Sequence, residues 1–216
     1  MDGLRLQGKL NKAWGRAAGK TGLAYALYRP ASAINPPPLD AQNIVLSALL
    51  CSLSNKGHFE QALAFGHSEW QSWHDAARSC VGDYLVGPAG TFFVAAQQPL
   101  LPPLLVQCNR IFTVTRPTQP LGAGAVGYGG DTPGNDPILL REWPASCLEG
   151  SKGEENRVEL PLDVKNPWWR VLMPEFPGVV LQASDVLTDE QGQRYLINSA
   201  ELTPLGWRLK TVLKQA

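Results

Sequence analysis

Charged side chains are scarce in this sequence. Only 18% of its 216 residues are Asp, Glu, Lys or Arg, and the formal net charge is zero, whereas about 25% is usual for a soluble domain. The low content predicts that part of the surface is hidden against partners, and the zero net charge argues against polyanion binding by the whole chain. Apolar stretches are short as well. None reaches the roughly 18 residues of a membrane-spanning helix, and none follows the N-terminal basic residues as in a signal peptide.

Motifs for metal binding and catalysis are also lacking. The cysteines lie far apart and form no CxxC pair, which argues against zinc and predicts free thiols in a reducing compartment. They are Cys51, Cys80, Cys108 and Cys147. The histidines lack the spacing of helical metal ligands and are expected in loops or on the surface. They are His58, His67 and His74.

One stretch imitates a phosphate-binding loop. Gly15–Thr21 has one residue too few between its glycines, and it lies inside a predicted helix instead of following a strand. A GxSxG nucleophile elbow does not occur either. The sequence therefore predicts a protein that is not an enzyme and that uses no cofactor and no metal.

Glycine and proline are abundant, with 21 and 18 residues, and they favour turns and short strands. Runs typical of strands lie at 25–28, 43–54, 92–96, 104–107, 110–115, 138–143, 168–173, 178–182, 193–198 and 207–213. The run 43–54 also fits a buried helix by periodicity, but its β-branched start and the Asn55-Lys56-Gly57 turn favour a strand. Gly122–Gly130 contains too much glycine to pack and is expected to be a mobile loop.

An internal repeat connects the two halves of the chain. Positions 83–85, 90, 93–94 and 102 correspond to positions 185–187, 192, 195–196 and 204, each pair being separated by 102 residues. Both copies read as an Asp-x-Leu strand, a turn ending in Gly, a strand led by an aromatic residue and a turn with Pro. Asp83 and Asp185 hold equivalent positions, and we expect each carboxylate to accept backbone N–H bonds at its turn.

These observations predict a mainly β fold with two tandem small β-barrel or sandwich units behind an N-terminal amphipathic helical arm. The expected boundaries are an arm with a Pro-rich linker at 1–40, a first β unit at 41–120, a Gly-rich loop at 121–137 and a second β unit at 138–216. Residues 83–104 and 185–206 should then have the same strand order.

The N-terminus carries the most uneven charge in the chain. Residues 1–30 hold six basic side chains against Asp2 alone. The apolar spacing over 4–21 predicts one amphipathic helix with its lysines and arginines on the opposite side. Lys9, Lys12 and Arg16 are therefore candidates for docking onto an acidic surface or nucleic acid. A simply solvated helix face is the alternative.

A second candidate interface contains two adjacent tryptophans. On a strand, Trp168 and Trp169 point to opposite sides, so that one indole faces the barrel and the other faces outward. An outward Trp beside Arg170 has the composition of an interface hot spot, whereas packing in the core is the alternative for either indole alone.

Several stretches resemble a family of uncharacterised proteins encoded among the structural genes of tailed bacteriophages. They are Gly15-Arg-Ala-Ala with Tyr28-Arg-Pro30, Val81-Gly-Asp-Tyr-Leu85, Gln97–Pro102 with Cys108-Asn-Arg110, Trp143-Pro-Ala-Ser146, Pro167-Trp-Trp169, and Asp185–Arg208. The closing unit also looks like the small barrel of stopper-type head–tail joining proteins.

The resemblance implies a virion protein, assembled in the host bacterial cytoplasm, that forms a sixfold or twelvefold ring of its own copies in the neck. Its neighbours would be the portal or adaptor protein and tail proteins, with non-specific contact to packaged DNA and none to a membrane. The arm and the Gly-rich loop are expected to become ordered on assembly. A tail or baseplate protein is the main alternative, and a nucleic-acid-binding β-barrel is a weaker one.

Overall fold

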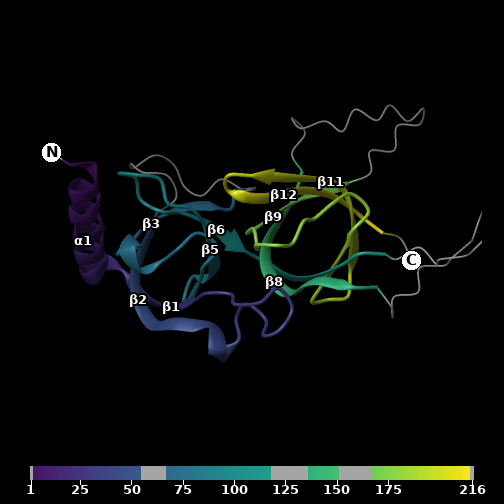
Figure 1. The fold of residues 1–216 in the computed structure, drawn as a ribbon, viewed down its shortest axis with the longest axis horizontal. Helices are drawn as coiled ribbons and strands as arrows, with labels where there is room; N and C mark the ends of the chain where they lie inside the picture. Colours follow the sequence, from purple (N-terminus) through teal and green to yellow (C-terminus); the bar gives the residue numbers. More distant parts are fainter. Residues whose placement is uncertain (1, 55–66, 118–135, 151–166, 215–216) are drawn as a thin grey trace, which may run out of the picture.

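The computed structural model describes residues 2–54, 67–117, 136–150 and 167–214 (Figure 1). The helix α1 spans Gly3–Thr21, and two short 3-10 helices are η1 (Ala41–Asn43) and η2 (Ala76–Arg78). The strands of the first half are β1 (Leu23–Tyr28), β2 (Ile44–Ser54), β3 (Glu69–Trp73), β4 (Tyr84–Gly87), β5 (Gly90–Ala96) and β6 (Leu104–Cys108). Those of the second half are β7 (Arg110–Thr115), β8 (Ile138–Glu149), β9 (Trp168–Met173), β10 (Val186–Asp189), β11 (Arg194–Thr203) and β12 (Gly206–Leu213).

The strands close into two barrels in tandem, which confirms the predicted fold class. The first barrel has the order β1-β2-β3-β6-β5-β4, and the second has β7-β8-β9-β12-β11-β10. These are the same topology, so the predicted repeat extends over the whole barrel. The register agrees as well, because Tyr28 pairs with Ile44 as Thr115 pairs with Ile138, and the irregularities that follow in the two ladders lie at matching positions.

The constant separation predicted from the sequence holds for only part of each hairpin. Tyr84 pairs with Phe93, whereas Val186, 102 residues further on, pairs with Leu196. The second hairpin is therefore one residue longer, and the alignment shifts by one after its turn. The predicted strand at 178–182 is not formed, because the chain turns at Gly178 and the Val179 N–H donates to the Phe176 carbonyl at 3.1 Å. The predicted Gly-rich loop lies almost wholly outside the described residues.

Both cores contain an aromatic trio at matching positions. In the first barrel Phe92 packs edge to face against Tyr25 and Trp70, with ring centroids 6.2 and 6.1 Å away. In the second, Tyr195 packs in the same way against Phe112 and Trp169, both at 5.7 Å. Such pairs contribute about 0.5–1.5 kcal/mol each beyond their burial. The duplicated trio shows that the two barrels share a core design although few of the residues are identical.

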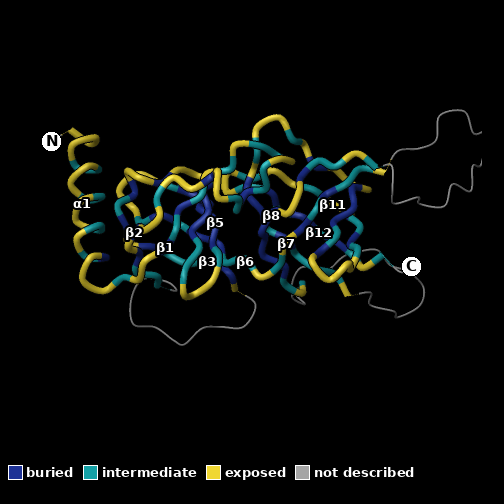
Figure 2. The backbone as a smooth tube through the Cα atoms, turned by 90° about the horizontal axis from the view of Figure 1, so that it is seen from below, coloured by how far each residue is buried: buried dark blue, intermediate teal, exposed yellow. Residues whose placement is uncertain are grey.

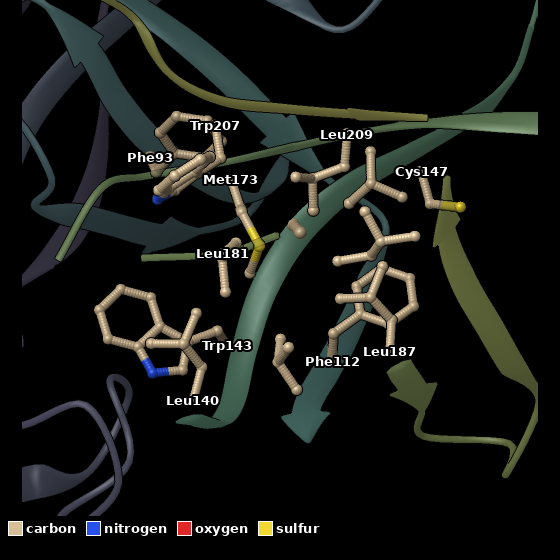
Figure 3. Close-up of a cluster of buried hydrophobic side chains, with 14 of the residues drawn as sticks. Phe93, Phe112, Leu140, Trp143, Cys147, Met173, Leu181, Leu187, Trp207 and Leu209 are labelled. Atoms are coloured by element: carbon tan, nitrogen blue, oxygen red, sulfur yellow. The ribbon is translucent and has the colours of Figure 1, made fainter. Parts of the chain in front are cut away.

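The barrels are joined rigidly. One residue, Asn109, connects β6 to β7, and its side chain accepts from the Cys147 N–H at 2.7 Å and donates to the Cys147 carbonyl at 2.8 Å. The Tyr84 hydroxyl donates to the Pro144 carbonyl at 2.9 Å. Phe93, on the outer face of the first barrel, enters the core of the second (Figure 3). The two barrels therefore form one elongated body (Figure 1).

Strand pairing places the domain boundaries differently from the expected ones. β1 was expected within the arm at 1–40, but it pairs with β2 and β4 and closes the first barrel. β7 was expected in the first β unit, but it pairs with β8 and β10 and belongs to the second barrel. The pairings show to which barrel each of these strands belongs, and they join segments that are distant in the sequence.

The Pro-rich stretch is a packed strap, defined here as residues 29–43, and does not separate independent parts. The Ala33 carbonyl accepts hydrogen bonds from the Trp143 indole N–H at 2.9 Å and from the Arg141 N–H at 3.0 Å. The Asn43 amide donates to the Pro37 carbonyl at 2.8 Å. The strap thus leaves the first barrel, contacts the second and returns to β2.

An Arg–Asp ion pair holds each barrel closed at matching positions. Arg29, directly after β1, binds both carboxylate oxygens of Asp83 at 2.7 Å. Arg116, directly after β7, binds Asp185 in the same way at 2.7 and 2.8 Å. Both carboxylates are almost fully buried. Each also accepts a backbone N–H three residues upstream, as expected.

We predict that Arg29→Met lowers the free energy of unfolding by about 3 kcal/mol, because it leaves a buried carboxylate without its cation. Arg116→Met should act similarly in the second barrel. Arg78→Met, which removes an exposed pair with Asp75 at 3.4 Å, should cost less than about 1 kcal/mol. Urea unfolding of the variants measures this, and equal losses in all three would contradict the proposed role of the buried pairs.

Candidate interaction surface on the N-terminal helix

The predicted helix is present, but it lies on the first barrel instead of extending away as an arm. The Asp2 carboxylate caps it by accepting the Leu4 N–H at 3.2 Å. Its inner side contacts β2, β3 and η2, with Ala18 fully buried. Gly15 allows close approach, because a Cβ there would lie 3.1 Å from the Asp75 Cβ. Figure 1 shows the helix across the end of the molecule opposite the second barrel.

The connection between the helix and β1 is short and tightly packed. A single residue, Gly22, connects them, and its N–H donates to the Ala18 carbonyl at 2.7 Å. A Cβ at Gly22 would lie 2.6 Å from the Ala18 oxygen and 2.8 Å from the Cys51 backbone. Only glycine fits there without displacing backbone, so the orientation of the helix is fixed by the barrel.

Five cations form a stripe on the outer side of the helix, here called the basic stripe. They are Arg5, Lys9, Lys12, Arg16 and Lys20, all exposed. Spacings of three and four residues place them in one row, and the row is about 22 Å long at 1.5 Å per residue. Figure 2 shows exposed residues along the side of the helix that faces away from the barrels.

The basic stripe is not neutralised within the described part of the chain. None of its members takes part in the ion pairs that the described residues form. Like charges three and four residues apart destabilise a helix by about 0.2–0.5 kcal/mol per pair. The helix also contains Gly8 and Gly19, which meet no neighbouring atoms and cost up to about 1 kcal/mol each relative to Ala. Docking on the barrel must offset these costs, and an anionic partner would relieve the repulsion.

Three exposed leucines, one in the first turn of the helix and two in the loop that contacts the helix through Gln7, are here called the leucine cluster. Leu4 is 83% exposed, Leu100 44% and Leu101 53%. Gln7, one turn after Leu4, accepts the Leu100 N–H at 2.6 Å and so ties the loop to the helix. Leu100 has a φ of +64°, a left-handed conformation that is rare for a leucine. The end of the molecule therefore combines apolar and cationic side chains.

The predicted tryptophan site lies elsewhere, on β9 of the second barrel, and is not brought together with Lys9, Lys12 or Arg16. The two indoles point to opposite sides, as expected. Trp169 packs on Tyr195 in the core. Trp168 lies against Gly150, with the Lys210 ammonium 5.3 Å from its ring centroid. Both indoles and Arg170 are half-buried, so neither tryptophan is the freely exposed side chain that was expected.

A buried polar network lies near the docked helix. The His74 imidazole bonds to the Ser72 hydroxyl through Nδ1 and to the Ser79 hydroxyl through Nε2, both at 2.8 Å. Gln97 donates to the Ser79 hydroxyl at 2.7 Å. The expectation of loop or surface histidines is wrong for His74, which is fully buried. His67 is exposed, and His58 lies outside the described residues.

The chemistry of this network is structural. Burial lowers the pKa of His74 to about 4, so the imidazole is neutral at physiological pH. Ser72 is also fully buried, and both ring nitrogens of His74 have partners, whereas a Ser–His nucleophile must reach its substrate. The same burial raises the pKa of the neighbouring Cys51 thiol to about 12. Sequence reasoning missed this network because no local spacing distinguishes it.

Other kinds of site find little support in the described residues. Among them, no three His, Cys, Asp or Glu side chains gather in a way that could hold a metal ion. No helix in the described ranges is long and apolar enough to cross a membrane. The stretch Gly15–Thr21, whose sequence is similar to that of a phosphate-binding loop, lies within α1, as expected.

Searches of protein-family models, of curated proteins and of solved structures find no match to this chain. The candidate surface is therefore defined by the residues of this chain alone.

We predict that His74 makes stability depend on pH. Its pKa is about 4 in the fold and about 6.5 in an unfolded chain, so the unfolded state binds an additional proton between these values. The part of the free energy of unfolding that depends on neutral His74 is fully present above pH 6.5. As the pH falls towards 4, about 3 kcal/mol of it is lost. Urea unfolding of His74→Asn should show a flatter pH profile than that of His67→Asn. Identical slopes for the two variants would contradict this assignment.

Proposed function

We propose that this chain is a structural subunit of a tailed-phage virion that forms a ring in the neck, between portal and tail. In this proposal it has no catalytic role. The basic stripe docks onto an acidic protein surface of a ring neighbour or of an adjoining neck protein. The position in the neck follows from the resemblance of the sequence to phage structural proteins and to stopper-type barrels.

The basic stripe is the observation that carries the proposal. It presents five cations from one end of a two-barrel body, and the body holds the helix through Gly22 and Asp75. Because the cations are presented on a docked helix, little ordering entropy is lost when a partner binds. A single exposed ion pair contributes little binding free energy. In a ring the same ion pairs recur at every subunit, so that their contributions to binding add up.

The leucine cluster favours a protein partner over nucleic acid. Leu4, Leu100 and Leu101 lie on the flank of the helix. A protein surface can bury such side chains at its centre and place acidic groups around them. A phosphate backbone offers them no apolar contact.

Charge reversal tests the docking. Lys9→Glu, Lys12→Glu and Arg16→Glu together should reduce incorporation into virions about tenfold, taking about 0.5 kcal/mol for each exposed pair. Mass spectrometry of purified particles, assembled with the variant in place of the wild type, gives the copy number. As a matched control, Lys12→Glu alone should reduce incorporation more than Arg141→Glu, an equal charge change at an exposed residue of the second barrel. A normal copy number for the triple variant would refute docking by the basic stripe.

A separate binding measurement distinguishes nucleic acid from protein. If the stripe bound duplex DNA through five phosphate contacts, the logarithm of the binding constant would fall with the logarithm of salt concentration with a slope of about −4.5. We expect the purified chain to bind a short DNA duplex too weakly for such a slope to be measured. Tight binding with that slope, lost in the triple variant, would replace the acidic protein by DNA as the partner.

A further inference from the structure

The helix α1 rests on the part of the first barrel that contains the polar network around His74, here called the His74 cluster. Its members are Ser72 on β3, His74, Ser79 directly after η2, and Gln97 directly after β5. α1 contacts β3 and η2, and its Gly15 lies against Asp75, the residue that follows His74. Gln7 of α1 binds Leu100 in the loop that follows β5. Each member of the cluster therefore lies on or beside a segment that α1 contacts.

The second barrel has apolar side chains at the positions that correspond to this cluster. The matching registers of β3 and β9 against the strands before them identify two of these positions, and the distance to the aspartate of the closing ion pair identifies the third. In the order Ser72, His74 and Ser79, the corresponding residues are Val171, Met173 and Leu181. All three are buried in the core of the second barrel, and Figure 3 shows Met173 and Leu181 within it.

The comparison separates the His74 cluster from the needs of the fold, because the second barrel closes in the same topology without it. What differs is the element that covers these positions. In the second barrel, Phe93 of the first barrel enters the core that contains Met173 and Leu181. Exposing such a core to water costs about 25 cal/mol per Å², so its cover has to stay in place. Hydroxyl, imidazole and amide groups can instead exchange their partners for water, and the His74 cluster therefore tolerates the removal of its cover.

The cover of the His74 cluster is also the most weakly held element of the first barrel. Ala18 is the one buried residue of α1, whereas most strands of the barrel contribute several side chains to the core. An element with so few buried contacts opens at a lower free energy than the strands beside it. Once released, α1 would unfold, because a helix of this length with three glycines is marginal in water.

Protonation of His74 would place a charge where the docked helix excludes water. Burial is the main reason that the pKa of His74 is lowered to about 4, and the neighbouring carboxylate of Asp75 opposes it only in part. The titratable groups on the surrounding elements are Asp75 and Arg78 beside η2, Glu69 on β3 and Cys51 on β2. The loop after β5 and the inner side of α1 contain no charged residue. None of the ion pairs formed by the described residues includes His74, so water is the better environment for the imidazolium.

We propose that α1 is a releasable cap: neutral His74 keeps the helix docked, and protonation of His74 releases it while the first barrel stays closed. The pKa of a hydrated imidazole is about 6.5 and that of docked His74 is about 4, so release takes up a proton between these values. Above pH 6.5 docking is independent of pH, and towards pH 4 its equilibrium constant falls by up to about 300-fold. Release abolishes the ordered row of the basic stripe. In this last step the inference rests on the proposed function, whose docking site it makes sensitive to pH.

Hydrogen–deuterium exchange of the full chain, read by mass spectrometry, tests the cap. Between pH 7 and pH 4.5, and after correction for intrinsic exchange rates, the protection of the α1 amides should fall at least about tenfold, because the released helix unfolds. The amides of β4 and β5 should keep their protection, because the barrel stays closed. Unchanged protection of α1, or an equal loss in α1 and β5, would overturn the inference.

The second barrel supplies a matched variant. Ser72→Val, His74→Met and Ser79→Leu together rebuild its apolar cluster in the first barrel, and α1 of this variant should be equally protected at both pH values. His67→Asn, at an exposed histidine, should behave like the wild type. If the apolar variant fails to fold, His74→Asn alone should remove the pH dependence of α1 protection, whatever the level of that protection. A folded variant without His74 that keeps the pH dependence of the wild type would overturn the inference. The measurement needs no partner, so its outcome is independent of whether the basic stripe docks onto an acidic surface.

Discussion

The buried ion pair between an arginine after the first strand and an aspartate before the fourth is the contact on which each barrel depends. Arg29 and Asp83 join the end of β1 to the turn before β4, the seam at which the first barrel closes. The carboxylate also orders that turn by accepting a backbone N–H. Since Arg29 begins the strap, the same contact fixes where the strap leaves the barrel and allows it to reach the second one.

The two barrels share the design of their interiors but differ in their outer surfaces. Register, irregularities and aromatic trio agree between the barrels, whereas their outer faces do not. The outer face of β4–β6 in the first barrel carries Phe93 and Val106 into the core of the second, and α1 covers part of its opposite end. A face that is buried against the other barrel needs no charges, and β4, β5 and β6 contain none.

Features with a local period could be predicted from the sequence. The helix followed from its apolar spacing, most strands from their apolar runs, and the role of Asp83 and Asp185 from turn chemistry. Partners distant in the sequence could not be predicted. Arg29 lies 54 residues from Asp83. The barrels to which β1 and β7 belong were also missed, because each strand pairs with a strand far along the chain, β4 and β10 respectively. β3 was missed because its Glu-Trp-Gln-Ser-Trp sequence has no continuous apolar run. His74 was placed wrongly because its serine partners are common residues with no signature.

The same limits explain why the candidate surface was recognised only in part. The sequence indicated a basic helix, but a helix with three glycines and five cations in a row is a poor autonomous helix and was expected to be a free arm. The barrel stabilises the helix, which approaches it closely at Gly15 and is joined to it through Gly22, where only glycine fits. Gly15 weakens the isolated helix but permits its docking on the barrel, and docking holds the mutually repelling cations in a fixed row. A free arm would lose that order on release and regain it at an entropic cost on binding. The docked helix presents its charges already arranged for a partner.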